Sequence, residues 1–336
     1  MAQTRAERIK QRAEGAGRFE HDAPDAGGPD SSSDPVGPSD LGKSDYKGVL
    51  KRTLKEFKED NLTDWAAALT YYGVLSLAPG LLVLVSLLGV FGTSATQPLM
   101  DSITALAPGP ARDILTTTVD NLTSANAAGV AFFIGIAAAL WSASNYVGAF
   151  IRAANAIYEV EEGRPFWKLR PLQIALTVVG VVILALISVL VVISGPLARQ
   201  VGDLIGLGDL SVTIYNIAKW PIIAIILAVM IAGLYYIGPN VKHPKFQWVS
   251  PGGIIAIVLW VVASLAFALY VANFPPNPAY GTIGAVILFL TWLWISNIAI
   301  LLGLEMNAEL ERQKKIMEGM PATQEPFLPA KDDPNS

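Results

Sequence analysis

The sequence predicts an all-α, polytopic membrane protein with six transmembrane helices and both chain ends in the cytoplasm. Only 15% of its 336 residues are charged, whereas about a quarter are charged in a typical soluble domain. The charges are also clustered, so that long runs contain no Asp, Glu, Lys, Arg or His, and the longest run extends from 246 to 304. Because about 20 apolar residues let a helix cross the hydrocarbon layer, these runs are predicted to be membrane spans.

The N-terminal segment has the composition of an unfolded tail. Residues 1–44 are rich in Asp, Gly, Pro and Ser, and such a segment cannot bury enough apolar surface to fold. We therefore expect a disordered cytoplasmic tail.

Residues 45–64 are expected to form an amphipathic interfacial helix. Apolar side chains from Val49 to Phe57 share one helical face, including Leu50 and Leu54, and cations surround them. Such a helix lies in the lipid interface with its cations toward anionic headgroups. The candidate headgroup contacts are Lys47, Lys51, Arg52, Lys55 and Lys58. A plain juxtamembrane helix without lipid selectivity is the alternative.

A six-helix transmembrane domain is predicted over residues 65–311, followed by a cytoplasmic tail at 312–336. Proline removes a backbone donor and clashes with the preceding turn, so helix breaks or kinks are expected at Pro79–Gly80 and Pro239–Asn240. A tight turn is expected at Tyr280–Gly281. The expected spans are 65–92, 129–157, 172–197, 212–237, 250–273 and 282–304.

The orientation follows from the distribution of Lys and Arg. The flank before the first span, from Lys47 to Lys58, carries five, and the successive loops then carry one, three, one, two and none. The flank directly after the sixth span carries three, up to Lys315. Cations favour the cytoplasmic side of a membrane. Six spans with both termini inside agree with this alternation.

The second expected span carries a polar stripe. Ser142, Asn145, Arg152, Asn155 and Glu159 recur at spacings of three or four along this span, which places them along one side of a helix. Polar groups in hydrocarbon need partners, so the stripe is expected to face protein or a polar cavity. The candidate cavity or substrate contacts are Ser142, Asn145, Asn155, Asn297, Tyr71, Tyr72 and Lys219. For Lys219, near a span end, snorkelling to the interface is the simpler interpretation.

The inner end of this cavity has its own candidates. With the predicted orientation, Arg152 and Glu305 lie at a similar depth near the cytoplasmic interface. They form a candidate ion pair or inner gate, with Glu159 as a competing partner for Arg152. A structural lock within the bundle is the alternative for these charges.

Features of an enzyme are missing from the sequence. It contains no cysteine and two isolated histidines, so no thiolate or histidine metal site is expected. HExxH, GxSxG, P-loop and Rossmann motifs do not occur. The basic stretches alternate with acids, as in KEFKED, which is not typical of a nucleic-acid surface. We therefore expect no enzyme, no metal or other cofactor, and no nucleic-acid partner.

Several motifs together resemble the YihY/BrkB family of bacterial inner-membrane proteins. They include NAIYEVEEGRPFWKLR, YYIGPN, WVSPGGIIAIVLW, FALYV and YGTIGAVILFLTWLWISNIAILLGLEMNAEL, and the resemblance covers about 47–311. It implies six helices in the bacterial plasma membrane but no settled activity, since members have been labelled from serum resistance to ribonuclease and transport has been proposed. Positions matching the family's polar signature are Tyr71, Tyr72, Pro79, Asn145, Arg152, Asn155, Tyr158, Pro239, Asn240, Tyr280, Gly281, Asn297, Glu305 and Asn307.

The expected function is transport. We expect a transporter, exporter or flippase that passes a small solute or lipid through a polar intramembrane cavity. A non-transporting scaffold or envelope-integrity protein is the alternative, and a ribonuclease is disfavoured. Small residues at Ala66–Ala68 and Ala137–Ala139 permit close helix contacts, within one bundle or in an oligomer.

Overall fold

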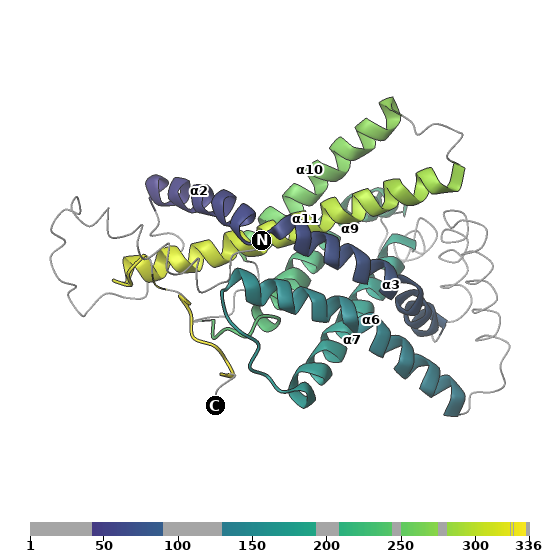
Figure 1. Cartoon of the computed structure of the whole chain (residues 1–336). Helices are drawn as coiled ribbons and strands as arrows, with labels where there is room; N and C mark the ends of the chain where they lie inside the picture. Colours follow the sequence, from purple (N-terminus) through teal and green to yellow (C-terminus); the bar gives the residue numbers. More distant parts are fainter. Residues whose placement is uncertain are drawn as a thin grey trace.

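The described part of the chain is helical. The computed structural model describes residues 42–89, 130–192, 208–243, 250–274, 281–322, 324 and 326–333, and these contain seven helices and no strand longer than an isolated bridge (Figure 1). The all-α prediction is thus confirmed over these residues. Most of the expected N-terminal tail lies outside them. The helices are α2 (Lys43–Glu59), α3 (Leu62–Gly89), α6 (Val130–Ile157), α7 (Phe166–Val192), α9 (Gly208–Ile237), α10 (Pro251–Asn273) and α11 (Gly281–Met317).

Each expected span overlaps one helix from α3 to α11. Four described stretches are long and apolar enough to cross a bilayer, and they lie in α7, α9, α10 and α11. The protein is therefore a membrane protein, whereas the full number of six spans and the orientation remain predictions. Helix α3 continues through Pro79 and Gly80 rather than ending there. Helix α9 ends at Ile237 and α11 begins at Gly281, while Tyr280 lies outside the described residues.

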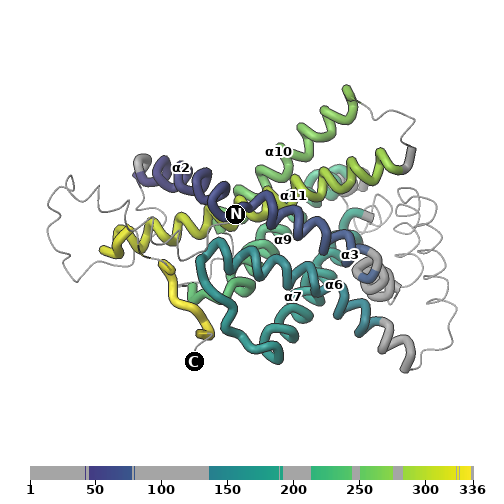
Figure 2. Tube along the Cα trace, in the orientation of Figure 1, coloured from purple at the N-terminus to yellow at the C-terminus, as the bar shows by residue number. Residues whose placement is uncertain are grey.

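The 37-residue helix α11 is the central element, and it packs against α2, α3, α6 and α10. It is much longer than the expected span 282–304, because the charged sequence after Leu304 keeps the helical conformation up to Met317. Helix α2 lies along this extension, as Figure 2 shows. We call the part of the molecule where residues 305–317, 158–165, 238–243 and 326–333 gather the polar end.

Helices α10 and α11 cross at van der Waals distance because glycines face each other. A Cβ on Gly252 would collide with the carbonyl oxygen of Gly303, and a Cβ on Gly303 would collide with the carbonyl oxygen of Gly252. The crossing also caps α10, since Ser250 accepts a 3.0 Å hydrogen bond from the Gly253 nitrogen and Asn307 accepts one of 2.8 Å from the Gly252 nitrogen. Ser250 is a typical N-cap residue.

Helix α2 forms where a helix was expected and packs along α11, while its position in the lipid interface remains a prediction. Val49 is fully buried against Leu310, and Arg52 donates to Glu309 at 2.5 Å and to Gln313 at 2.6 Å. The helix thus follows α11 beyond its apolar part, and Arg52 is a partner of α11 rather than a free headgroup contact. Leu50 and Leu54, expected on the same apolar face as Val49, remain exposed together with Lys47, Lys51, Lys55 and Lys58.

The C-terminal segment packs onto the polar end. Phe327 and Leu328 are buried in the main core, where the ring of Phe327 lies 5.7 Å from that of Tyr158. Ala330 forms an antiparallel bridge with Val241, and the Lys331 ammonium reaches three carbonyl oxygens at the end of α9. We call residues 326–333 the C-terminal clasp.

Candidate functional site

The part of the α6 stripe around Asn145 is packed against α7. Asn145 accepts a 3.1 Å hydrogen bond from Arg170, which also donates to Gln173 at 2.9 Å. The Arg170 guanidinium lies 3.9 Å over the ring of Trp141 and donates to the Trp141 carbonyl oxygen. Ser142 is half-buried beside this group. In this conformation the stripe therefore contacts protein at Asn145.

Asn297 is held by two other helices. Its side chain is 1% exposed, its oxygen accepts from the Tyr146 hydroxyl at 2.8 Å and its nitrogen donates to Thr70 at 3.1 Å. One amide therefore joins α3, α6 and α11. The sequence singled out Asn297 as a polar group in an apolar helix, but only the structure identifies these partners.

Asn155 lies at the centre of a network that connects two loops. Its nitrogen donates to Glu162 at 2.9 Å and its oxygen accepts from the backbone nitrogen of Asn240 at 2.7 Å. Glu162 also accepts from the Arg164 side chain at 2.7 Å. Although burial alone would raise the pKa of Glu162, the hydrogen bonds and charge of Arg164, together with Asn155, hold it below its usual value.

The other candidate residues do not converge on one point. Arg152 is exposed, and its guanidinium lies 5.4 Å over the ring of Tyr72. Tyr71 is 62% exposed. Lys219 lies elsewhere, on α9, where it is 3.3 Å from the Asn216 side chain.

Glu305 is buried without the predicted partner. It is 1% exposed, and its Oε2 atom has no hydrogen-bond partner among the described residues. No ion pair between Arg152 and Glu305 forms within the described ranges, because Arg152 is directed to Tyr72. Glu159, two residues beyond the end of α6, adopts the left-handed backbone conformation, with φ 55°.

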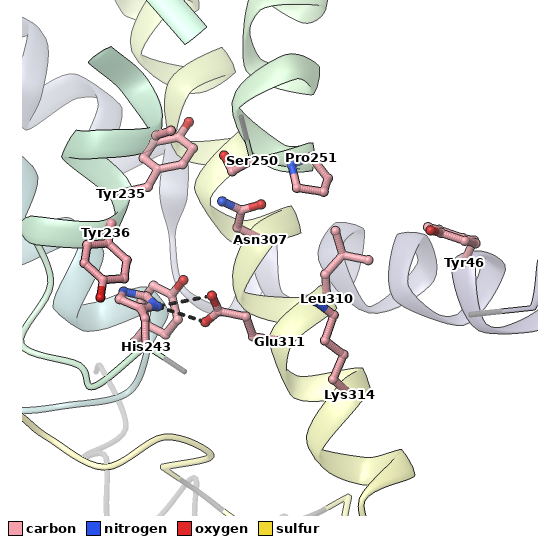
Figure 3. A pocket seen from close by; sticks show the side chains of 12 residues that line it. Tyr46, Tyr235, Tyr236, His243, Ser250, Pro251, Asn307, Leu310, Glu311 and Lys314 are labelled. Atoms are coloured by element: carbon pink, nitrogen blue, oxygen red, sulfur yellow. Dashed lines mark hydrogen bonds and ion pairs between the residues drawn. The ribbon is translucent and has the colours of Figure 1, made fainter. Parts of the chain in front are cut away.

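A small cavity lies at the polar end between α9, α10 and α11 (Figure 3). Its volume is about 50 Å³, which is enough for one or a few water molecules. The lining combines aromatic rings with carboxylate, imidazole, amide and hydroxyl groups. It comprises Tyr46, Tyr158, Ala232, Tyr235, Tyr236, His243, Ser250, Pro251, Asn307, Leu310, Glu311 and Lys314.

His243 and Glu311 form the charged centre of this lining. The Nδ1 atom of His243 lies 3.1 Å from each carboxylate oxygen of Glu311, as the dashed lines in Figure 3 mark. The imidazole lies between the rings of Tyr158 and Tyr236, with centroids 5.3 and 5.2 Å away. Burial raises the pKa of Tyr158 well above its usual value, and the charge of Glu311 and a hydrogen bond to it raise it further.

Sequence reasoning missed this cavity. His243 was set aside as isolated and Glu311 was not singled out, because 68 positions separate them and no helical periodicity connects them. Tyr158 and Asn307 were named only through the family signature. Within the described ranges no three His, Asp or Glu side chains gather as a metal ion would require. The cavity offers hydrogen-bond donors, acceptors and a carboxylate to a small polar group.

Comparison with known proteins finds relatives among membrane proteins. The profile of the family described as virulence factor BrkB matches residues 53–326. A ribonuclease-like protein of Bacillus subtilis, YfkH, is 34% identical over 257 residues, which cover 76% of this chain and 92% of that protein.

Two further relatives are named UPF0761 membrane proteins. The one from Photobacterium profundum is 28% identical, with 84% of this chain and 89% of that protein covered. The one from Aeromonas salmonicida is 26% identical, with 78% and 89% covered. No solved structure matches the chain.

Proposed function

This chain belongs to the virulence factor BrkB family and is a multi-pass protein of the bacterial plasma (inner) membrane, and we propose that it moves a small solute or a lipid across that membrane. The path runs beside α6, and the cavity at the polar end is its inner mouth. The present structure is then the closed state of the path.

The cavity at the polar end carries this proposal. It brings His243, Glu311 and Tyr158 together from three separate parts of the chain, next to the ends of α6, α9 and α11. Transporter sites combine polar side chains with helix ends inside an apolar bundle. A cavity of about 50 Å³ is smaller than the 300 Å³ or more of a typical ligand pocket, so the helices must separate before a substrate enters.

The polar contacts on α6 support a path that opens along this helix. The contacts Asn145–Arg170, Asn297–Tyr146 and Asn297–Thr70 are side-chain hydrogen bonds between helices. Such bonds contribute only about 0.6 kcal/mol each in membrane proteins, so their exchange for substrate contacts is energetically feasible. Asn145 and Asn297 are our candidate substrate contacts, with Ser142 beside them.

We also infer the membrane arrangement from the charges. Helices α3 and α6 cross in addition to the four apolar helices, which gives six spans and puts the polar end in the cytoplasm. This arrangement agrees with the alternation of Lys and Arg between loops. The exposed Leu50 and Leu54, with Lys47, Lys51, Lys55 and Lys58 around them, would then contact anionic lipid near the cytoplasmic surface.

A non-transporting scaffold is the second candidate, and one observation favours it. The two buried asparagines among the candidate contacts, Asn155 of α6 and Asn297 of α11, both have their side-chain amides hydrogen-bonded within the protein. A permanently closed bundle would have this arrangement. RNA cleavage is a third candidate function, suggested by the ribonuclease-like name of the Bacillus subtilis relative. We expect that this chain does not cleave RNA.

Reconstitution into phosphatidylethanolamine–phosphatidylglycerol vesicles tests transport. One arm measures inward movement of a fluorescent phospholipid by its protection from an impermeant quencher. The other arm measures release of trapped radiolabelled amino acids, glucose and nucleosides. In one of the two arms we expect the transport rate to exceed that of protein-free vesicles. Glu311→Gln should reduce this rate at least tenfold, whereas Lys219→Gln, far from the cavity, should leave it unchanged. Equality of both arms with protein-free vesicles would favour the scaffold.

A further inference from the structure

Glu305 is a buried carboxylate in negatively charged surroundings. It is almost fully buried, and its Oε2 atom has no hydrogen-bond partner within the described residues. Negative charges from several neighbouring elements act on it. They belong to Glu56 of α2, Asp60 of the following turn, Glu159 at the end of α6 and Glu309 of α11.

The nearby cations are bound to other acids. Arg52 donates to Glu309 at 2.5 Å, and Arg312 lies 3.5 Å from the same carboxylate. Lys55 lies 3.7 Å from Glu56. No cation forms an ion pair with Glu305 in the described part of the chain, so an ionised Glu305 would lack compensation. A buried carboxylate without a compensating cation is costly in free energy. The carboxyl group therefore keeps its proton and stays neutral.

Tyr158 is the residue of the cavity lining that responds to Glu305. It forms a hydrogen bond with Glu311, and it interacts electrostatically with both Glu311 and Glu305. A tyrosine hydroxyl donates and accepts hydrogen bonds, so it is suited to pass a proton between two carboxylates. Glu311 is 23% exposed at its side chain, and it is therefore in reach of water.

We propose that Glu305 is a proton-binding site of the bundle: it carries a proton in this closed structure and releases it through Tyr158 and Glu311 when the polar end opens to water. Proton binding stands on the burial and the surroundings of Glu305 alone. Its coupling to a carried solute or lipid rests on the transport function proposed above. A carboxylic acid forms or breaks only its O–H bond in this step, so no further reactant is needed.

Infrared spectroscopy of the full chain in lipid tests proton binding directly. A protonated carboxyl group has a C=O stretching band that shifts in D₂O and that carboxylates lack. We expect this band at neutral pH in the wild type and its loss in Glu305→Gln. The matched control is Glu309→Gln, one turn further along α11 and equally buried, but ion-paired; it should keep the band. Loss of the band in Glu309→Gln alone, or its absence from the wild type, would overturn the proposal.

Thermal unfolding provides a second readout. If the folded state holds a proton that the unfolded chain releases above about pH 4.3, the free energy of unfolding falls as the pH rises. We expect Glu305→Gln to remain folded, because a neutral amide replaces a neutral acid, and to show a flatter dependence on pH. If the free energy of unfolding depended on pH equally in the wild type and in Glu305→Gln, the proposal would be contradicted. It would also be contradicted if NaCl stabilised the wild type more than choline chloride does and Glu305→Gln removed this difference, because a sodium ion would then occupy the site.

The coupling is tested separately. A pH gradient across the vesicles should drive accumulation of the carried compound in the wild type, whereas Glu305→Gln should only equilibrate it. A normal infrared band without any transport would leave the proton site intact and refute the transport function. Gradient-driven accumulation by Glu305→Gln would refute the coupling.

Discussion

The side-chain oxygen of Asn155 accepts a 2.7 Å hydrogen bond from the backbone nitrogen of Asn240, 85 positions later in the chain. The bond joins the end of α6 to the turn after α9. The same amide group donates to Glu162. Two loops and two helix ends are therefore held in register by one buried side chain.

Asn155→Leu keeps the size of this side chain but removes both hydrogen bonds. We expect a loss of about 2 kcal/mol in the free energy of unfolding, since a buried donor or acceptor left without a partner costs about 1–3 kcal/mol. Thermal unfolding in lipid nanodiscs measures it. Asn273→Leu is the control, because that amide bonds only an exposed carbonyl in its own helix. If both variants lost the same free energy of unfolding, the two hydrogen bonds of Asn155 would not stabilise the fold as we expect.

The pH dependence of stability should include a contribution from Glu162. Its pKa is lowered in the folded state, so its stabilising contribution is present above the unfolded value of about 4.3 and is lost as the pH falls through the folded value. In Glu162→Gln the unfolding midpoint should therefore depend less on pH in this acidic range. A midpoint that varies with pH identically in both proteins would contradict the assignment.

The crossing of α10 and α11 should not accept a methyl group. Gly303→Ala places a Cβ against the carbonyl oxygen of Gly252 and the Cβ of Ala256, and overpacking of this kind costs about 1–3 kcal/mol. Gly233→Ala is the matched control in α9, where an added Cβ meets nothing within 4 Å. We expect a clear fall in the unfolding temperature for the first variant only. Similar temperatures for both would mean that the helices cross less closely.

Asn297 and Tyr146 should be energetically coupled. A double-mutant cycle of Asn297→Ala and Tyr146→Phe should give a coupling of about 0.5–1.5 kcal/mol in unfolding free energy, in the range of interhelical bonds in membranes. Additive effects would contradict the 2.8 Å contact. In the transport assay Asn297→Ala should raise KM, because it removes a proposed substrate contact. Tyr146→Phe should not raise KM, because the Tyr146 hydroxyl holds Asn297 only in the closed state.

The C-terminal clasp should tighten at alkaline pH. Burial and the charge of Arg164 lower the pKa of Lys331 to about 8, so release of the clasp binds a proton, and its stability rises between about pH 8 and the unfolded value near 10.4. A spin label on Pro326→Cys should become more immobilised over this range. In a Lys331→Met background, where no ammonium titrates, the label should respond little; an equal response would refute the role of Lys331.

The sequence predicted the positions of the helices much better than the side-chain contacts between them. Apolar length located α7, α9, α10 and α11, because a membrane span is fixed by composition alone. Polar periodicity showed which side of α6 must be covered, but it could not show that Arg170 covers Asn145 or that Tyr146 holds Asn297. Those choices depend on how helices cross, which the pattern of one helix does not contain.

The polar end was predicted least well. Helix α11 continues to Met317 through charged residues that a span prediction excludes. The clasp inserts Phe327 and Leu328 into the core from the segment 312–336, which was expected only to be a cytoplasmic tail. His243 and Glu311 meet only because α11 extends past the turn that follows α9.

Cysteine accessibility tests the central claim of a path along α6 most directly. The natural chain has no cysteine, so Ser142→Cys and Ser144→Cys each introduce a single thiol, at the half-buried stripe position and at a fully buried neighbour. The account predicts that a small, charged thiol reagent modifies Ser142→Cys in vesicles, and does so faster when Asn297→Ala weakens the closed state, while Ser144→Cys stays unmodified. If Ser142→Cys is inert in both backgrounds at every pH, the stripe is permanently closed and the protein is not a transporter along this path.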